Sequence, residues 1–147
     1  MNDGTNRALL IVFIVVAFPV VFTALWVSIT FVLSRVGGWH RVARRYAANG
    51  KPAGGKEIHY LTGMVGVVSY RLVLTVIVAE QGLYIATRKV FSVGHPPLFI
   101  PYSAICNAQF RSLFFKEYVS FEIEEEPIAT VWLPSKVFDG VPVQIAR

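Results

Sequence analysis

An uninterrupted apolar stretch near the N-terminus limits what this chain can fold into more than any other feature. Residues 8–33 read ALLIVFIVVAFPVVFTALWVSITFVL and contain no charged side chain. A run of 18 or more apolar residues is typical of a helix that crosses a membrane. At about 1.5 Å per residue the stretch forms a helix of roughly 39 Å, longer than a hydrocarbon core of about 30 Å. The sequence therefore predicts a transmembrane helix over residues 8–33, with a kink at Pro19.

The alternative interpretation of this stretch is a secretory signal peptide that is removed by cleavage. The stretch is longer than the apolar region of a signal peptide, which has about 7–15 residues. Only Arg7 precedes it as a basic residue, and no Ala-x-Ala cleavage site follows it. We therefore expect a retained membrane anchor.

Basic residues are concentrated directly after the apolar stretch. Residues 1–7 contain only Arg7, whereas residues 34–51 contain five basic residues and no acidic one: Arg35, Arg41, Arg44, Arg45 and Lys51. Because such residues usually mark the cytoplasmic end of a membrane helix, we expect residues 1–7 outside and residues 34–147 in the cytoplasm. The single cysteine, Cys106, agrees with a reducing compartment, since it has no disulfide partner in the chain.

The rest of the chain is electrically balanced. Residues 55–147 hold eight basic and eight acidic residues, so the net charge of +5 comes from residues 34–54. A basic segment beside a membrane helix favours contact with anionic lipid headgroups, which we expect as one partner. A nucleic-acid-binding domain would carry the basic surface itself, so nucleic acid is not expected as a partner.

Residues 38–48 show the pattern of a short amphipathic helix. Its apolar positions are spaced as i, i+3, i+4 and i+7: Trp39, Val42, Ala43 and Tyr46. We expect this helix to lie in the membrane surface, where the contacting residues would be Trp39, Arg41, Arg44, Arg45 and Tyr46. The alternatives are that it continues the membrane helix or packs on the following domain; Gly37 and Gly38 favour a bend. Residues 34–56 then form a basic juxtamembrane segment that ends in a flexible linker, NGKPAGGK.

The pattern changes to that of β-strands in residues 57–147, which predicts a mainly β domain. Residues 61–79 are apolar enough to suggest a second membrane helix, but Arg71 would lie mid-span and the many β-branched residues favour strands. A hairpin turn is expected at residues 80–82, and further strands over residues 83–89, 98–100, 105–115, 118–124 and 128–133. Within 118–124, Phe121 is expected to face the core and Glu122 the solvent. Apolar residues at helical spacing in 134–147 predict a short C-terminal helix.

The segment LVLTVIVAEQGLYIAT, followed by PPLFIPYSAI, resembles the core of bacterial pleckstrin-homology-like (PH-like) and GRAM-like domains. The resemblance spans about residues 58–146, and HPPLFIPYSAI is also similar to small bacterial membrane proteins with one N-terminal span. It implies a β-sandwich or open barrel closed by the C-terminal helix, in a bacterial inner membrane protein that binds lipid or protein. Members that bind phosphoinositides carry basic residues at their first hairpin. Here the clear hairpin turn is Glu80-Gln81-Gly82, so specific phosphoinositide binding is not expected.

No pattern for catalysis, metal binding or cofactor binding stands out in the sequence. The soft metal ligands are His40, His59, His95 and Cys106, and no pair of them has metal-site spacing. There is no glycine-framed nucleophile and no glycine-rich phosphate loop. We therefore expect neither enzymatic activity nor a cofactor.

Two features point to protein or membrane contacts. Leu113, Phe114 and Phe115 follow each other between Arg111 and Lys116, which suggests a loop that enters a partner or the membrane. The alternative is that at least two of these three apolar side chains belong to the core.

On the apolar helix, Ala17, Ala24 and Ser28 fall on one face, where small side chains let a second membrane helix approach closely. The alternative is that this face simply contacts lipid. The sequence as a whole predicts a membrane-tethered, non-enzymatic interaction module. The competing hypothesis is an accessory subunit of a larger membrane protein complex, held through its transmembrane helix.

Overall fold

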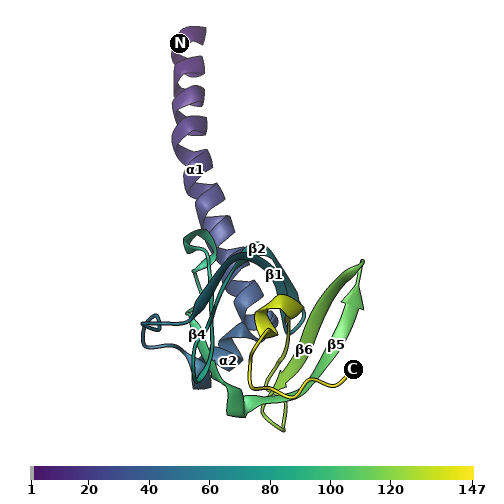
Figure 1. Ribbon diagram of the computed structural model, residues 1–147. Coiled ribbons are helices and arrows are strands. Elements are labelled where there is room, and N and C mark those ends of the chain that lie inside the picture. Colours follow the sequence, from purple (N-terminus) through teal and green to yellow (C-terminus); the bar gives the residue numbers. More distant parts are fainter. Residues whose placement is uncertain (1) are drawn as a thin grey trace.

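The computed structural model describes residues 2–147, in which a long helix projects from a curled β-sheet (Figure 1). Helix α1 (Asp3–Val36) includes the whole predicted stretch and contains Pro19 within it. It is long and apolar enough to cross a membrane, and the rest of the chain leaves its most apolar portion uncovered. The prediction of an N-terminal apolar helix is therefore confirmed, with a few more residues at each end.

A two-residue corner, Gly37 and Gly38, separates α1 from helix α2 (Trp39–Tyr46). Gly38 adopts a φ of +89°, a backbone conformation that glycine reaches without steric cost. The corner is covered by the turn at Gly66, whose backbone lies so close that a Cβ atom there would overlap the carbonyl oxygen of Gly37. The close backbone contact at this corner holds the end of α1 against the β domain.

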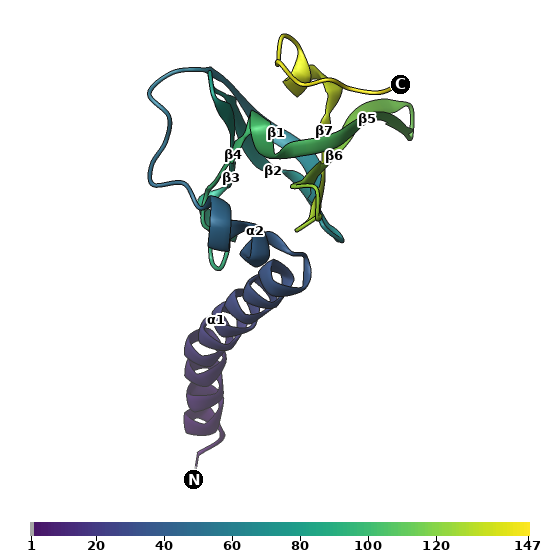
Figure 2. The same ribbon diagram turned by 90° about the horizontal axis from the view of Figure 1, so that it is seen from below.

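Seven antiparallel strands form one sheet in the order β4-β3-β2-β1-β7-β6-β5. The strands are β1 (Lys56–Val65), β2 (Val68–Val78), β3 (Gly82–Thr87), β4 (Leu98–Pro101), β5 (Ile105–Leu113), β6 (Lys116–Ile123) and β7 (Thr130–Pro134). Two meanders, β1–β4 and β5–β7, are joined where Met64 and Val65 pair with Trp132 and Val131. The sheet curls into a half-barrel (Figure 2). Residues 61–79 thus lie mainly in strands β1 and β2, as the β-branched residues predicted. The first hairpin turn, at Gly66 and Val67, was not predicted and precedes the expected turn at residues 80–82.

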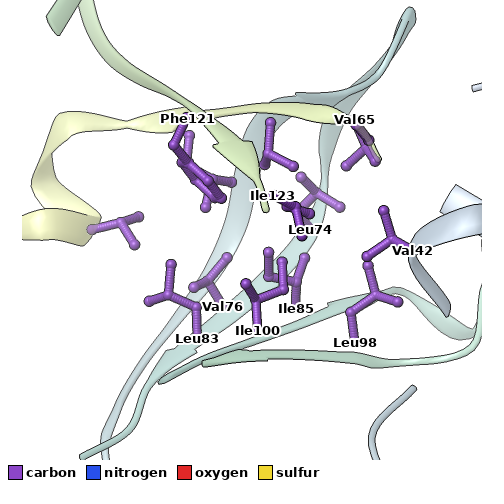
Figure 3. Packing of buried hydrophobic residues seen from close by; sticks show 14 of the residues in the cluster. Val42, Val65, Leu74, Val76, Leu83, Ile85, Leu98, Ile100, Phe121 and Ile123 are labelled. Atoms are coloured by element: carbon purple, nitrogen blue, oxygen red, sulfur yellow. The ribbon is translucent and has the colours of Figure 1, made fainter. Parts of the chain in front are cut away.

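The core lies inside the curl and follows the alternation of the strands. Val119, Phe121 and Ile123 of β6 are completely buried, as predicted, and meet residues from β1 to β4 (Figure 3). Val42 of α2 belongs to the same hydrophobic cluster. Helix α2 therefore covers part of the open side of the half-barrel.

The predicted C-terminal helix is not found. Residues after β7 form one 3-10 turn, η3 (Ser135–Phe138), whose Val137 and Phe138 reach the core. The chain then runs on without helix, and Ala146 forms a bridge with Gln109 of β5. Gly140, at a φ of +80°, and Pro142 interrupt the helical spacing, so the apolar residues of the tail pack one by one.

The orientation of β6 leads to a stability prediction. Phe121 is completely buried and its ring lies 5.7 Å from that of Phe138, so Phe121→Ala should cost about 3–5 kcal/mol of unfolding free energy. Thermal unfolding of the full chain in mild detergent, followed by the circular dichroism of the β-sheet, measures this loss.

The matched control is the next residue, Glu122, which faces outward and accepts one hydrogen bond from Asn107 at 2.7 Å. Glu122→Ala should cost about 1 kcal/mol or less, since a single exposed hydrogen bond contributes little. Equal losses at both positions would contradict the assignment of one buried and one exposed face.

Candidate functional site

A buried aromatic cluster fixes the corner between the helices to the sheet. It consists of Trp39 of α2, Tyr70 of β2 and His95 of the β3–β4 loop, with ring centroids 5.2–5.4 Å apart. The Trp39 indole donates a hydrogen bond to the carbonyl oxygen of Pro96 at 2.9 Å. Three segments that are distant in sequence therefore meet next to the C-terminal end of α1.

The hydrogen bonds of His95 define its tautomer. Its Nδ1 lies 3.0 Å from the carbonyl oxygen of Val93, which can only accept, so Nδ1 carries the proton. Nε2 then accepts a hydrogen bond from the Tyr70 hydroxyl at 2.8 Å. Burial lowers the pKa of His95 and raises that of Tyr70, because both charged forms are poorly solvated there. The neutral forms of both side chains are thus held together.

The β3–β4 loop, which contains the 3-10 turn η1 (Lys89–Phe91), runs along the last turns of α1. The Trp26 indole donates to the carbonyl oxygen of Val90 at 3.3 Å, and its ring lies 5.3 Å from that of Phe91. Further along the helix, the Ser34 hydroxyl donates to the carbonyl oxygen of Gly94. This loop is therefore a second contact between α1 and the β domain.

The expected position of α2 in a membrane surface is corrected by the structure. Trp39, Val42 and Ala43 are buried against the sheet, so the apolar stripe packs on the domain, which was one of the two alternatives. The open side of a half-barrel needs an apolar cover, and the tail forms no helix that could supply one. Because lipid and a protein core both select the same apolar stripe, the sequence pattern could not distinguish them.

The polar side of α2 has two roles. Tyr46 and Arg45 both bind Glu124 at the end of β6, the hydroxyl at 2.7 Å and the guanidinium at 2.5 Å. These hydrogen bonds, that of Tyr46 first, hold the pKa of Glu124 below its usual range. Arg41 and Arg44 are exposed and border a hollow together with Arg45 and Ile128. Contact of Arg41 and Arg44 with anionic headgroups stays a prediction.

The turn between β5 and β6 is exposed and strained. Phe114 is 86% exposed and Phe115 is fully exposed, so the alternative that two of the three apolar residues are core is wrong. Their φ angles are +48° and +62°, values that favour Asn-Gly or Asp-Gly in a two-residue hairpin turn. A side chain in this left-handed region costs roughly 1–2 kcal/mol. Stability therefore does not explain why two phenylalanines occupy this turn.

A groove of about 370 Å³ lies beside this turn on the outer face of the sheet. Its apolar lining comes from five strands and the turn, and includes Met64, Leu72, Leu113, Phe114, Tyr118 and Trp132. Arg71 and Lys116 add positive charge. The turn and the groove together form an apolar and basic surface, which we call the hairpin surface.

The small residues of α1 lie on the side of the helix opposite Trp26. At 3.6 residues per turn, Ala17, Ala24 and Ser28 fall within a narrow arc, about half a turn away from Trp26. Ser28 donates its hydroxyl to the carbonyl oxygen of Ala24 at 2.8 Å, so its polar group is satisfied within the helix. The β3–β4 loop contacts the other side of α1, so a role of this face in helix packing stays a prediction.

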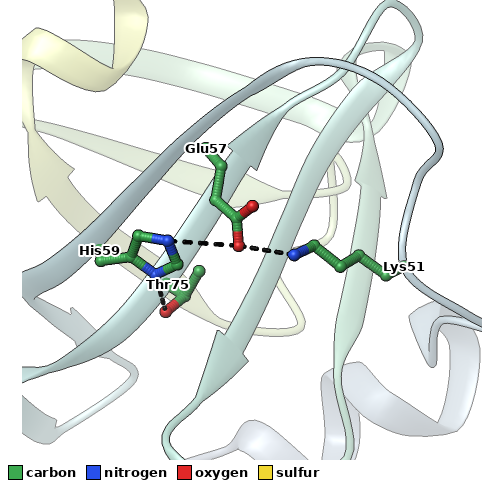
Figure 4. Close-up of polar contacts among 4 residues, drawn as sticks. All are labelled: Lys51, Glu57, His59 and Thr75. Carbon is green, nitrogen blue, oxygen red and sulfur yellow. Dashed lines mark hydrogen bonds and ion pairs between the residues drawn. The ribbon is translucent and has the colours of Figure 1, made fainter.

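An exposed polar cluster ties the predicted linker to the sheet (Figure 4). Lys51 lies 2.8 Å from Glu57, whose pKa this hydrogen bond lowers, and His59 lies 3.5 Å from the same carboxylate oxygen. His59 also contacts the hydroxyl of Thr75 at 3.3 Å. Exposed ion pairs contribute little to stability, so this cluster connects the linker to β1 only weakly.

Within residues 2–147, no three His, Cys, Asp or Glu side chains come close enough together to hold a metal ion. A comparison with models of known protein families found none that matches this chain, and a comparison with curated protein sequences found no match.

The aromatic cluster predicts a dependence of stability on pH. Because burial lowers the pKa of His95 below 6.5, the unfolded chain takes up a proton there at a higher pH than the folded chain does. Unfolding free energy should therefore fall as the pH falls through about 6.5. Thermal midpoints at about pH 7.5 and about pH 5.5 measure this change, and His95→Gln should reduce it.

The control is His40→Gln on α2, outside the aromatic cluster, which should keep the dependence of the unchanged protein. Glu57 and Glu124, whose pKa values are lowered, lose their stabilising effect only below about pH 4.5 and do not affect this range. If the thermal midpoint of the His95→Gln variant fell between these two pH values as much as that of the unchanged protein, His95 would not be the source of the pH dependence.

Proposed function

We propose that this protein is a membrane-tethered interaction module without enzymatic activity, whose hairpin surface binds another membrane protein. In this proposal α1 spans a bacterial inner membrane and the β domain lies in the cytoplasm. The observation that carries it is the exposure of Phe114 and Phe115 in a strained turn. Strain of this kind is concentrated at sites where another molecule makes use of the conformation.

The position of the hairpin favours a protein partner over the lipid surface. The β3–β4 loop, which contacts α1, leads into one edge strand of the sheet, whereas β5 is the edge strand at the other end. Figures 1 and 2 both show the β5–β6 hairpin well separated from α1. Together with Arg71 and Lys116, the aromatic lining suits a segment that carries apolar and acidic side chains.

The resemblance of the β domain to PH-like and GRAM-like domains belongs to this proposal. The curled antiparallel sheet and the hairpin turn at Glu80, Gln81 and Gly82 support it. One element differs from what the resemblance implies. The helix that covers the open side is α2, which precedes the strands, and no C-terminal helix closes them.

The proposed orientation predicts the result of a protease experiment. With five basic residues after the apolar stretch and one before it, residues 34–147 should be protected from a protease added to intact spheroplasts. Lysis with detergent should make the same residues accessible. Cleavage of the β domain in intact spheroplasts would overturn the orientation.

The role of the hairpin surface predicts opposite effects on stability and on binding. Replacing Phe114-Phe115 by Asn-Gly relieves the left-handed strain, so unfolding free energy should rise by roughly 1–3 kcal/mol. The same change removes the apolar tip, so a photo-crosslinking residue at Ser112 should lose its crosslink to the partner in cells. Thermal unfolding in detergent and the yield of the crosslinked species measure the two effects.

A matched control makes the same replacement in another exposed turn. Glu125-Glu126→Asn-Gly, between β6 and β7, should leave the crosslink from Ser112 unchanged. A crosslink that survives in the Phe114-Phe115 variant would contradict the proposed surface.

The second candidate function is an accessory subunit of a membrane complex, held through α1. It is favoured by the position of Ala17, Ala24 and Ser28, which face away from the β3–β4 loop and leave room for a second helix. Purification in mild detergent separates the two proposals. A stoichiometric membrane complex that persists in the Phe114-Phe115 variant would favour contact through α1.

A further inference from the structure

We propose that the β3–β4 loop is a second membrane-contact element, which places Val90 and Phe91 at the boundary between lipid headgroups and acyl chains. The inference rests on the proposed function only in that α1 must span a bilayer. It concerns a different surface from the hairpin, and a different partner, the lipid itself.

The β3–β4 loop contacts α1 at positions that precede the corner at Gly37 and Gly38 in the chain. Trp26, Thr30 and Ser34 follow each other on one face of α1 at intervals of four residues. Thr30 and Ser34 are buried, although the helix as a whole is exposed. Trp26 and Ser34 bind backbone carbonyl groups of Val90 and Gly94 respectively, so the loop covers the polar face of the helix. These two hydrogen bonds attach the loop to α1 at two points, one at Trp26 and one at Ser34.

The height of Trp26 along α1 gives the depth of the loop. Trp26 follows Ala8, where the apolar stretch begins, by a rise of about 27 Å, close to the core thickness of about 30 Å. A helix that enters the bilayer at Ala8 therefore brings Trp26 to the inner boundary, where tryptophan is enriched. Because Val90 and Phe91 contact Trp26, they lie at the same depth. The apolar stretch is longer than a bilayer requires, and its last turns are the part that the loop covers.

The composition of the loop suits this boundary. Val90 is 63% exposed although it is apolar, and Val93 is partly exposed. Arg88 and Lys89 precede them and are exposed, while Arg35 of α1 provides a third positive charge near the helix end. No acidic residue occurs in residues 81–116. Apolar side chains flanked by basic ones are the pattern of a segment that enters an anionic interface.

The depth of a fluorescent label tests this proposal in the full chain. In a Cys106→Ser background, single cysteines at Val90 and at Leu72 carry the same environment-sensitive fluorophore. Leu72 is the matched control, because it is 62% exposed but lies on β2 at the hairpin surface. The protein is reconstituted in vesicles of phosphatidylcholine and phosphatidylglycerol that contain lipids with a quencher near the headgroup. The label at Val90 should lose most of its fluorescence, and the label at Leu72 should keep it.

A third label, at Val16, separates failure of this inference from failure of the proposed function. Val16 lies near the middle of the apolar stretch and is exposed on α1, so lipids with a deep quencher should quench it if α1 spans the bilayer. Quenching at Val16 with equal fluorescence at Val90 and Leu72 would overturn the membrane contact of the loop alone. A label at Val90 that is protected from aqueous iodide but not quenched by lipid would also overturn it, because a second copy of the chain would then cover the loop. No quenching at Val16 would refute the anchor and the inference together.

Discussion

Burial of the Trp39 indole at the corner between the two helices is the interaction on which the rest of the architecture depends. The indole contacts the rings of Tyr70 and His95, and its N–H reaches the backbone at Pro96. These contacts place α2 over the open side of the half-barrel and bring the β3–β4 loop to α1. Since each polar atom of the cluster has a partner, the cluster can be buried without the cost of unsatisfied groups.

The end of α1 and the β domain are also packed directly against each other at the corner. Gly37 and Gly38 turn the chain, and the turn at Gly66 packs directly on the backbone of Gly37. Arg45 and Tyr46 bind Glu124 at the far end of α2, so the helix is attached to the sheet at both ends. The β domain and the end of α1 therefore form one packed unit.

Local periodicity was enough to predict the apolar helix and the β-strands, but not the position of α2 or the lack of a C-terminal helix. Alternation in residues 118–124 placed Phe121 inside, and the absence of charge in residues 8–33 predicted α1, because both patterns reflect burial directly. The apolar stripe of α2 was ambiguous, since a bilayer and a protein core select the same residues. The turn at Phe114 and Phe115 was missed as a two-residue turn, because nothing in β propensity indicates a positive φ at phenylalanine. The contact of Trp26 with the β3–β4 loop joins residues 64 positions apart, which no local pattern reports.

If α1 spans a bilayer as we propose, the direct packing at the corner has a mechanical consequence. A helix longer than the local bilayer responds by tilting, and it tilts further as the bilayer becomes thinner. Because Gly66 packs on Gly37 and Ser34 binds Gly94, we expect the β domain to rotate together with α1. The hairpin, at the other edge of the sheet from the β3–β4 loop, would then change its distance from the lipid surface. Membrane thickness would then set how far from the lipid surface Phe114 and Phe115 are presented.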